Sequence, residues 1–292
     1  MEIRNVLFAT DFSECAAKAQ ETAFDVAERF GAKIHIVHAL EVPLPIFEPY
    51  AVAVPDRFLA EAREGAGAKL DAVMEAARGR GLDGTSALGE VPAAFAIKER
   101  AADIDADLVV VGTEGHTGLR HVFLGSVAEG VVRTAGCSVL TARGSIDDGD
   151  GPIVVGADFS EAGERAVAAA CELAETLGRS LHLVHSAPTT PPMVGPYEVA
   201  VPIDFHDAVI REAKSKLEAV AAECEIRGQV TCEVSPVPAH VAIPEIADKL
   251  GAPLVVVGSR GLTGLKHLVL GSVAERTVRH APCSVWIVRD DG

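Results

Sequence analysis

The amino-acid sequence predicts an α/β protein made of two tandem, doubly wound domains. The chain has 292 residues, a length that suits two domains of ordinary size better than one. Its segments recur in the same order at an offset of about 146 to 147 residues. Its residues are 49% apolar but only 4% aromatic, so Val, Leu, Ile and Ala must form the core. That composition is typical of a parallel sheet covered by helices on both faces.

The repeat divides the chain into two copies of one domain. We predict that the domains cover residues 1–144 and 152–292, joined by a polar, glycine-rich linker that ends at Pro152. The order of the recurring segments is preserved, which indicates a duplication. Residues 6–14 return as 153–161, 34–39 as 181–186, 111–126 as 257–272 and 139–143 as 285–289.

Each copy is expected to run β-α-β-α-β-α-β-α-β. In the first copy, Ser13 should cap the first helix, which ends near Gly31. The second helix is expected near 56–81, the third after Pro92 and the fourth after Ser126. Alternating strands and helices favour a five-stranded parallel sheet, with right-handed crossovers that place helices on both faces. The expected strands lie near 3–10, 33–40, 83–89, 107–113 and 137–143, and near 152–157, 180–186, 229–235, 253–259 and 283–289.

One connection in each copy, after the second strand, departs from this pattern. Residues 41–55 and 187–202 are rich in proline, partly apolar and longer than usual connecting loops. They either cover a site or a partner surface, or pack as loops over the ends of the sheet.

A glycine pattern follows the fourth strand of each copy. Gly112 and Gly115 come directly after a buried strand, and nine residues separate Gly115 from the Gly125-Ser126 pair. Glycines let backbone amides approach a bulky anion, and the Ser is expected to cap the next helix. Because a helix N-terminus favours negative charge, the pattern predicts a phosphate cradle. The second copy repeats the spacing with Gly258, Gly261, Gly271 and Ser272.

An aspartate follows the first strand of each copy, at Asp11 and Asp158. Ligands of an open parallel sheet bind beyond the carboxyl ends of the strands, where the strand order reverses, so each Asp should face its glycine loop. A carboxylate there can accept hydrogen bonds from ribose hydroxyls or an adenine amino group, which predicts a nucleotide site. The alternative is that each Asp only forms a helix entry and each glycine pattern is a flexible loop. The pattern is neither a Walker A loop, since its lysine is missing, nor the dinucleotide fingerprint, which follows the first strand.

The charge and hydropathy of the chain exclude several classes of partner. The net charge of −16 argues against a long basic surface, so we expect no nucleic-acid partner. No apolar run reaches the roughly 18 residues that a membrane helix needs. The first residues also lack the pattern of a signal peptide. We therefore expect a cytoplasmic protein without membrane insertion.

The six cysteines include no CxxC pair and no zinc spacing, so we expect no metal site. Buried free thiols are the expected state. A weaker alternative is a redox role for Cys224 and Cys232, which flank a short turn and could approach each other.

Taken together, the motifs of both copies resemble the universal stress protein family. They are Ala-Thr-Asp-Phe-Ser-Glu after the first strand, Val-Val-Gly-Thr/Ser-x-Gly-x-Thr-Gly-Leu after the fourth, then Leu-Gly-Ser-Val-Ala-Glu and Cys-Ser-Val. Both copies match along almost their whole length, as in a tandem member of the ATP-binding branch. The resemblance implies an adenine nucleotide alpha hydrolase-like fold, a cytoplasmic location and a role in stress survival or regulation. It also implies that the last strands, near 137–143 and 283–289, pair within one chain as a pseudo-dimer.

The same resemblance implies an adenine nucleotide as the ligand. ATP is expected, with AMP or ADP as alternatives and Mg²⁺ arriving with the nucleotide. No catalytic and no metal-ligating residue is assigned. By motif match, the cofactor-binding residues are Ala9, Thr10, Asp11, Ala39, Val111, Gly112, Glu114, Gly115, Gly125, Ser126 and Val127 in the first copy, and Gly156, Ala157, Asp158, Ser186, Val257, Gly258, Arg260, Gly261, Gly271, Ser272 and Val273 in the second.

The two copies differ in charge at the glycine loop. In the second, Arg260, Lys266 and His267 add positive charge. In the first, Glu114 lies between the two glycines, with three basic side chains in the segment 116–121. A carboxylate within about 5 Å of a phosphate repels it unless a metal bridges them. We therefore predict that the second domain binds ATP more tightly, unless Glu114 and Arg260 both point to solvent.

The leading functional hypothesis is a nucleotide-binding regulatory protein that acts on an unknown protein partner. The alternatives are an enzyme that consumes ATP and an adaptor that binds no nucleotide. No paired carboxylates or Ser-His-Asp pattern is recognisable, so we expect at most slow ATP hydrolysis. His38 and His185 end the second strands and are expected to be core or rim residues rather than bases, because no acidic partner can be placed near them. Association of two chains as a homodimer stays open.

Overall fold

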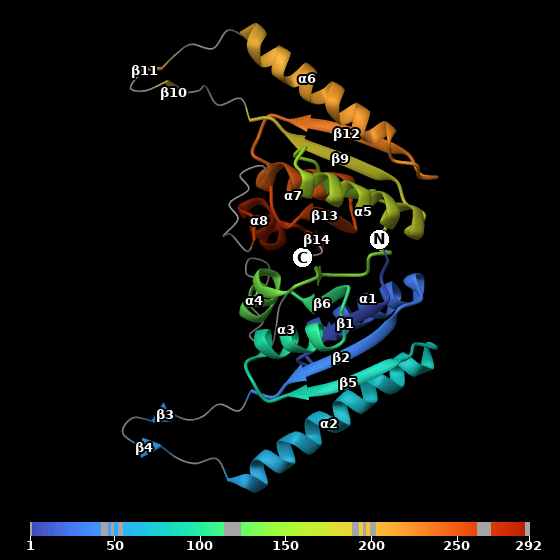
Figure 1. The fold of residues 1–292 in the computed structure, drawn as a ribbon, viewed down its shortest axis with the longest axis vertical. Helices are drawn as coiled ribbons and strands as arrows, with labels where there is room; N and C mark the ends of the chain where they lie inside the picture. Colours follow the sequence, from blue (N-terminus) through green and yellow to red (C-terminus); the bar gives the residue numbers. More distant parts are fainter. Residues whose placement is uncertain are drawn as a thin grey trace. The chain divides into compact units, whose positions relative to one another are not determined.

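The computed structural model divides the chain into two compact units, Glu2–Ser145 and a second unit that begins at Ile146. The linker is attached to the second unit, because Nη1 of Arg179 donates to the carbonyl oxygens of Gly149 and Gly151 at 2.9 and 3.1 Å. The structure describes residues 2–41, 46–47, 50–51, 55–113, 124–188, 193–194, 197–198, 203–261 and 270–289 (Figure 1).

The first domain contains the predicted parallel sheet. Its strand order is β7-β6-β1-β2-β5, and neighbouring strands are parallel throughout. Right-handed crossovers place α1 and α2 on one face and α3, which packs against α4, on the other. The elements are β1 (Asn5–Ala9), α1 (Glu14–Phe30), β2 (Lys33–Ala39), β3 (Ile46–Phe47), β4 (Tyr50–Ala51), α2 (Asp56–Gly79), β5 (Gly84–Gly89), α3 (Ala93–Asp103), β6 (Leu108–Gly112), α4 (Ser126–Thr134) and β7 (Ser138–Ala142).

The second domain repeats this topology. Its strand order is β12-β9-β8-β13-β14, again with parallel neighbours. In Figure 1 the long helices α2 and α6 lie alongside β5 and β12 of their own domains. The pairing of the last strands as a pseudo-dimer stays a prediction. The elements are β8 (Ile153–Gly156), α5 (Glu161–Leu177), β9 (Leu181–Ser186), β10 (Met193–Val194), β11 (Tyr197–Glu198), α6 (Ile203–Ala222), β12 (Val230–Ser235), α7 (Ala239–Leu250), β13 (Leu254–Gly258), α8 (Ser272–His280) and β14 (Ser284–Val288).

The proline-rich connections contain short strand pairs that the sequence analysis did not predict. β3 pairs with β4 and β10 pairs with β11, both antiparallel. Each of these strands has two residues. A strand of that length is too short to show the alternation by which strands are predicted from sequence.

The predicted cap of the first helix is confirmed, whereas the predicted serine cap of the fourth is wrong. Oγ of Ser13 accepts the amide of Ala16 at 3.1 Å. At the start of α4, however, Gly125 is the N-cap, no side chain caps the helix, and Ser126 is the first helical residue. In α8, Gly271 and Ser272 are arranged in the same way. Both Gly and Ser are accepted at N-caps, so the dipeptide alone does not decide which residue takes that position.

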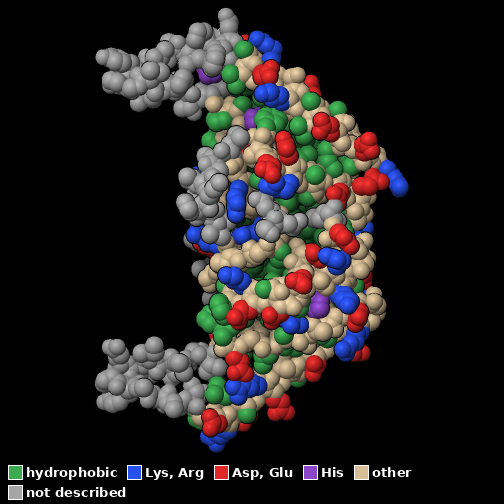
Figure 2. All heavy atoms as spheres, in the orientation of Figure 1, with side chains coloured by type: hydrophobic (Ala, Val, Ile, Leu, Met, Phe, Trp, Pro, Cys, Tyr) green, Lys and Arg blue, Asp and Glu red, His purple; other side chains and the backbone are tan. Residues whose placement is uncertain are grey.

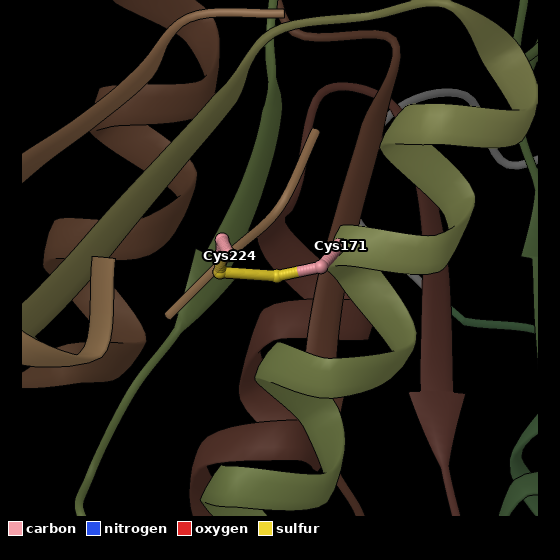
Figure 3. The surroundings of a disulfide bond; sticks show 2 residues. All are labelled: Cys171 and Cys224. Atoms are coloured by element: carbon pink, nitrogen blue, oxygen red, sulfur yellow. A yellow bond between two sulfur atoms is a disulfide. The ribbon is translucent and has the colours of Figure 1, made fainter. Parts of the chain in front are cut away.

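The expectation of free thiols is wrong for two cysteines. Cys171 of α5 and Cys224, just beyond α6, form a disulfide with 5.8 Å between their Cα atoms (Figure 3). The suggested approach of Cys224 to Cys232 is therefore also wrong. Cys232 lies on β12 as a free thiol, and burial raises its pKa.

Arg80, the residue after α2, ties that helix to α1. Its guanidinium lies 3.1 Å from Oε2 of Glu21 and 2.6 Å from Oδ1 of Asp25. A third carboxylate, that of Glu28, lies 2.6 Å from Nε. The hydrogen bond from Arg80 holds the pKa of Glu28 below its usual range. Only 29% of the Arg80 side chain is exposed, so these ion pairs are less screened by water than most surface pairs.

Arg80→Gln is expected to lower the free energy of unfolding of the first domain by about 1 kcal/mol. Because the pKa of Glu28 is depressed on folding, this contribution is present above the carboxyl pKa of the unfolded chain. It is lost as the pH falls through the folded pKa. The matched control is Arg227→Gln, since Arg227 lies 3.0 Å from Glu175 in the second domain but its side chain is 93% exposed. If urea unfolding shows the same loss of unfolding free energy for both variants, then the lower exposure of Arg80 does not make its ion pairs stronger.

Candidate functional site

The strand order reverses between β1 and β6 of the first domain. These strands are neighbours, with Ala9 opposite Val111, so the chain beyond both strands emerges at the same sheet edge. A cavity of about 350 Å³ lies there. Its lining residues come from the ends of β1, β2 and β6, from the segments that follow these strands, and from the starts of α1, α3 and α4. This is the position where open parallel sheets bind ligands.

Every predicted site residue that the structure describes in the first domain lines this cavity. Glu114 and Gly115 lie outside the described residues. The cavity has further lining residues that the sequence analysis did not select, including Ala93 and Ile97 of α3 and Glu41. The predicted residues that line it are Ala9, Thr10, Asp11, Ala39, Val111, Gly112, Gly125, Ser126 and Val127.

The turn after β1 is built around Asp11. One carboxylate oxygen of Asp11, Oδ1, accepts the amide of Ser13 at 2.9 Å. Phe12 between them has φ of 61°, in the left-handed region that non-glycine residues seldom adopt. Asp11 is thus a turn residue through this oxygen, and it is also one of the residues that line the cavity.

In the second domain, Asp158 faces its glycine loop as predicted. A methyl group built on Gly261 would lie 2.7 Å from Oδ2 of Asp158. The carboxylate therefore packs directly against the backbone of Gly261. A methyl group on Gly258 would lie 2.9 Å from the carbonyl oxygen of Ala162. Oδ1 of Asp158 accepts the amide of Ser160 at 3.0 Å. Gly261 therefore lies close to the side chain of Asp158, and Gly258 lies close to the backbone of the first turn of α5.

The remaining predicted residues of the second domain occupy the corresponding ends of its strands and helix. Gly156 and Ala157 follow one another at the end of β8, and Ser186 ends β9. Oγ of Ser186 donates to the carbonyl oxygen of Val237 at 2.7 Å, so this hydroxyl is directed to the loop before α7. The others are Val257 and Gly258 at the end of β13, and Gly271, Ser272 and Val273 at the start of α8.

Each wide glycine loop is closed at its base by a backbone hydrogen bond. The amide of Gly125 donates to the carbonyl oxygen of Thr113 at 2.9 Å, and that of Gly271 donates to Ser259 at 2.7 Å. These bonds bring the end of the fourth strand of each domain next to the start of its fourth helix. The unpaired amides of a helix N-terminus are therefore presented at the same edge as the aspartate.

The two sites differ in charge within the described residues. Glu41 lines the first cavity, and its Oε1 accepts the amide of Ala93 at 2.7 Å. Two residues after the end of β9, the second domain has Pro188 at the corresponding place. Arg260 is exposed beside Gly261, whereas Lys266 and His267 lie outside the described residues.

No described residues form a group of three or more His, Cys, Asp or Glu side chains able to hold a metal ion. His38 is among the residues that line the first-domain cavity.

Comparison with known proteins assigns the chain to a family. The model of the Universal stress protein family matches residues 2–143 and again residues 151–289. The chain belongs to the universal stress protein family. It carries two universal stress protein domains in tandem, which confirms the resemblance and the repeat.

Related universal stress proteins occur in distant organisms. One from Mycobacterium tuberculosis is 34% identical over 194 residues, a match that covers 63% of this chain and 62% of the relative. The chain thus spans less than two thirds of that relative's length. One from Bacillus subtilis is 32% identical over 148 residues, which cover 47% of this chain and 97% of the relative. The crystal structure of a universal stress protein from Archaeoglobus fulgidus superimposes on 99% of this chain, and the match includes 97% of the archaeal chain. The TM-score is 0.69 and the sequence identity is 21%, so the two proteins share the fold.

Two further observations concern surfaces. Among the residues that the structure describes, no helix has the length and apolar character needed to cross a membrane. On the face of this universal stress protein drawn in Figure 2, acidic and basic side chains are interspersed. The expected absence of a nucleic-acid partner stays a prediction.

Proposed function

We propose that each domain binds an adenine nucleotide at the edge where its strand order reverses. The observation that carries this proposal is the first-domain cavity, whose lining combines apolar side chains, a carboxylate and the N-terminus of a helix. Val37, Ala93 and Ile97 supply apolar surface for a base, and Asp11 supplies a carboxylate for hydroxyl or amino groups. The start of α4 at Gly125 supplies amides for phosphate oxygens.

The size of the cavity fits this ligand. Its volume of about 350 Å³ lies at the lower end of the roughly 300–1,000 Å³ of small-molecule pockets. A nucleoside would fill it, and the phosphates would extend along the glycine loop. Any Mg²⁺ would be held mainly by phosphate oxygens and water, as is usual for nucleotide-bound magnesium.

The proposed role is regulatory. Family membership supports a function in stress response. Nucleotide binding would change the surface at this edge of the sheet, which a protein partner would then recognise. Two other functions are an ATP-consuming enzyme and an adaptor without nucleotide. The cavity favours the nucleotide-binding protein over the adaptor.

Mass analysis of small molecules released from the purified protein tests the proposal first. An adenine nucleotide in stoichiometric amount supports it, and titration of the stripped protein with ATP then measures affinity. Turnover with Mg²⁺ above roughly 1 s⁻¹, within the ordinary enzyme range, that is lost in Asp158→Ala would instead favour the enzyme. No binding of ATP or ADP at millimolar concentration would favour the adaptor.

The second domain is expected to bind ATP more tightly than the first. Glu41 places a carboxylate at the first cavity, whereas Pro188 is neutral and Arg260 adds a cation in the second domain. Glu41→Gln and Glu114→Arg should therefore each strengthen binding by the first domain several-fold, measured in an Asp158→Ala background. Unchanged affinity in both variants would contradict the electrostatic argument.

A further inference from the structure

A histidine is the second-last residue of the second strand of each domain, and it contacts the turn that carries the aspartate. Nδ1 of His38 lies 2.8 Å from the carbonyl oxygen of Thr10. Nδ1 of His185 lies 2.7 Å from the carbonyl oxygen of Ala157. In each domain the bonded carbonyl belongs to the residue directly before the site aspartate.

The chemistry of this contact defines the protonation of the ring. A carbonyl oxygen only accepts hydrogen bonds, so Nδ1 must carry the proton and donate. The neutral ring therefore has its lone pair on Nε2. In the first domain the amide of Thr10 donates to the carbonyl oxygen of Val37 at 3.0 Å. The hydrogen bond from His38 therefore adds a second link between Thr10 and β2, next to this backbone bond.

Each histidine also packs against the residue that makes the turn. The ring centroids of His38 and Phe12 lie 4.4 Å apart, and those of His185 and Phe159 lie 4.3 Å apart. Phe12 and Phe159 have φ of 61° and 59°. A left-handed phenylalanine costs about 1–3 kcal/mol and persists only where the surroundings hold it. The histidine supplies two such restraints, a hydrogen bond before the aspartate and a ring contact after it.

We propose that His38 and His185 are positioning residues for Asp11 and Asp158. This inference rests on the proposed nucleotide site, and it identifies what holds the carboxylate in place. The ring fixes the residues on both sides of the aspartate, so the carboxylate is presented to the cavity before the ligand arrives. Such preorganisation improves affinity by lowering the ordering cost of binding.

The second strands offer matched controls. His35 and His182 lie three residues earlier, and their Nδ1 atoms contact Oγ1 of Thr85 and Thr231 at 2.8 and 2.7 Å. Both are 92% buried, and His35 does not line the cavity. Burial lowers their pKa. Like His38 and His185, these two histidines lie on the second strand of their domain and make one hydrogen bond through Nδ1. Unlike them, they do not contact the turn that carries the aspartate.

The experiment compares His185→Phe, His185→Asn and the control His182→Phe in the full chain. His185→Phe keeps an aromatic ring but loses the donor, whereas the amide of Asn can donate from near the Nδ1 position. We expect His185→Phe to weaken binding of both ATP and adenosine about tenfold and to leave inorganic triphosphate binding unchanged. His185→Asn should recover part of the loss, and His182→Phe should leave all three affinities unchanged.

A second readout does not need a ligand. The amide of Ser160 donates to Asp158, so its hydrogen exchange should be about tenfold faster in His185→Phe and unchanged in His182→Phe. Nitrogen NMR of the wild type should show the Nδ1–H tautomer of His185. Unchanged exchange, or the Nε2–H tautomer, would overturn the positioning role. If His185→Phe speeds the exchange of the Ser160 amide as expected but the wild type binds neither ATP nor adenosine, the positioning role stands and only the proposed function is rejected.

Discussion

Gly261→Val should weaken ATP binding by the second domain about 100-fold while leaving that domain folded. The backbone of Gly261 does not have the positive φ that would exclude other residues, so the substitution adds no backbone strain. The new side chain would instead meet Oδ2 of Asp158, which lies 2.7 Å from the position of its first carbon. Losing about two hydrogen bonds of roughly 1.5 kcal/mol each to a charged group corresponds to about 100-fold in affinity.

Calorimetric titration of the stripped protein with ATP measures this effect. The matched control is Gly67→Val in α2, because a methyl group at Gly67 meets no atom within 4 Å. The control should keep the affinity of the wild type. If Gly261→Val binds ATP normally at both sites while its circular dichroism is unchanged, then the glycine loop and Asp158 do not hold the nucleotide.

Breaking the Cys171–Cys224 disulfide should lower the free energy of unfolding of the second domain by about 4 kcal/mol. The two cysteines are 53 residues apart, and the entropy of closing a loop of that length in the unfolded chain predicts about this value. Urea unfolding with and without a thiol reductant measures it. Trp286, the single tryptophan of the chain, is fully buried in β14 and reports on the second domain.

The two domains provide an internal control for the disulfide. At the corresponding positions the first domain has Phe24 and Ala77, both buried and neither able to form a disulfide. Reductant should therefore leave the unfolding of the first domain unchanged. It should also have no effect on a Cys171→Ser, Cys224→Ser double variant. A midpoint that moves equally in the wild type and the double variant would show that the disulfide does not stabilise the domain.

The parts of the fold that could be predicted from the sequence are those with a local or a repeated signal. The runs around Val109 and Val255 are buried strands in the structure, and Ser13 caps α1. The repeat strengthens the motif, because the aspartate and the glycine pattern both recur in the second copy. Asp11 and Gly112 are expected at the same edge because the first and fourth strands are neighbours. Their relation depends only on strand order, and strand order follows from the alternation of strands and helices.

Other features have no such signal. The bond between Cys171 and Cys224 joins segments 53 residues apart, and the sequence pattern drew attention to Cys232 instead because it is nearby. The sequence predicts only that His38 is a core or rim residue rather than a base, so it does not indicate the contact with the carbonyl oxygen of Thr10. Recurrence of His38 as His185 was the available clue, since a histidine that returns beside a returning aspartate indicates a shared structural task.

Calorimetric titration of the stripped protein with ATP tests nucleotide binding by both domains most directly. The account predicts two sites per chain of unequal affinity, and Asp158→Ala should abolish the tighter one while Asp11→Ala abolishes the weaker. Absence of heat and of bound nucleotide at millimolar ATP would contradict it. A single site that survives both substitutions would contradict it equally, because the nucleotide would then lie elsewhere.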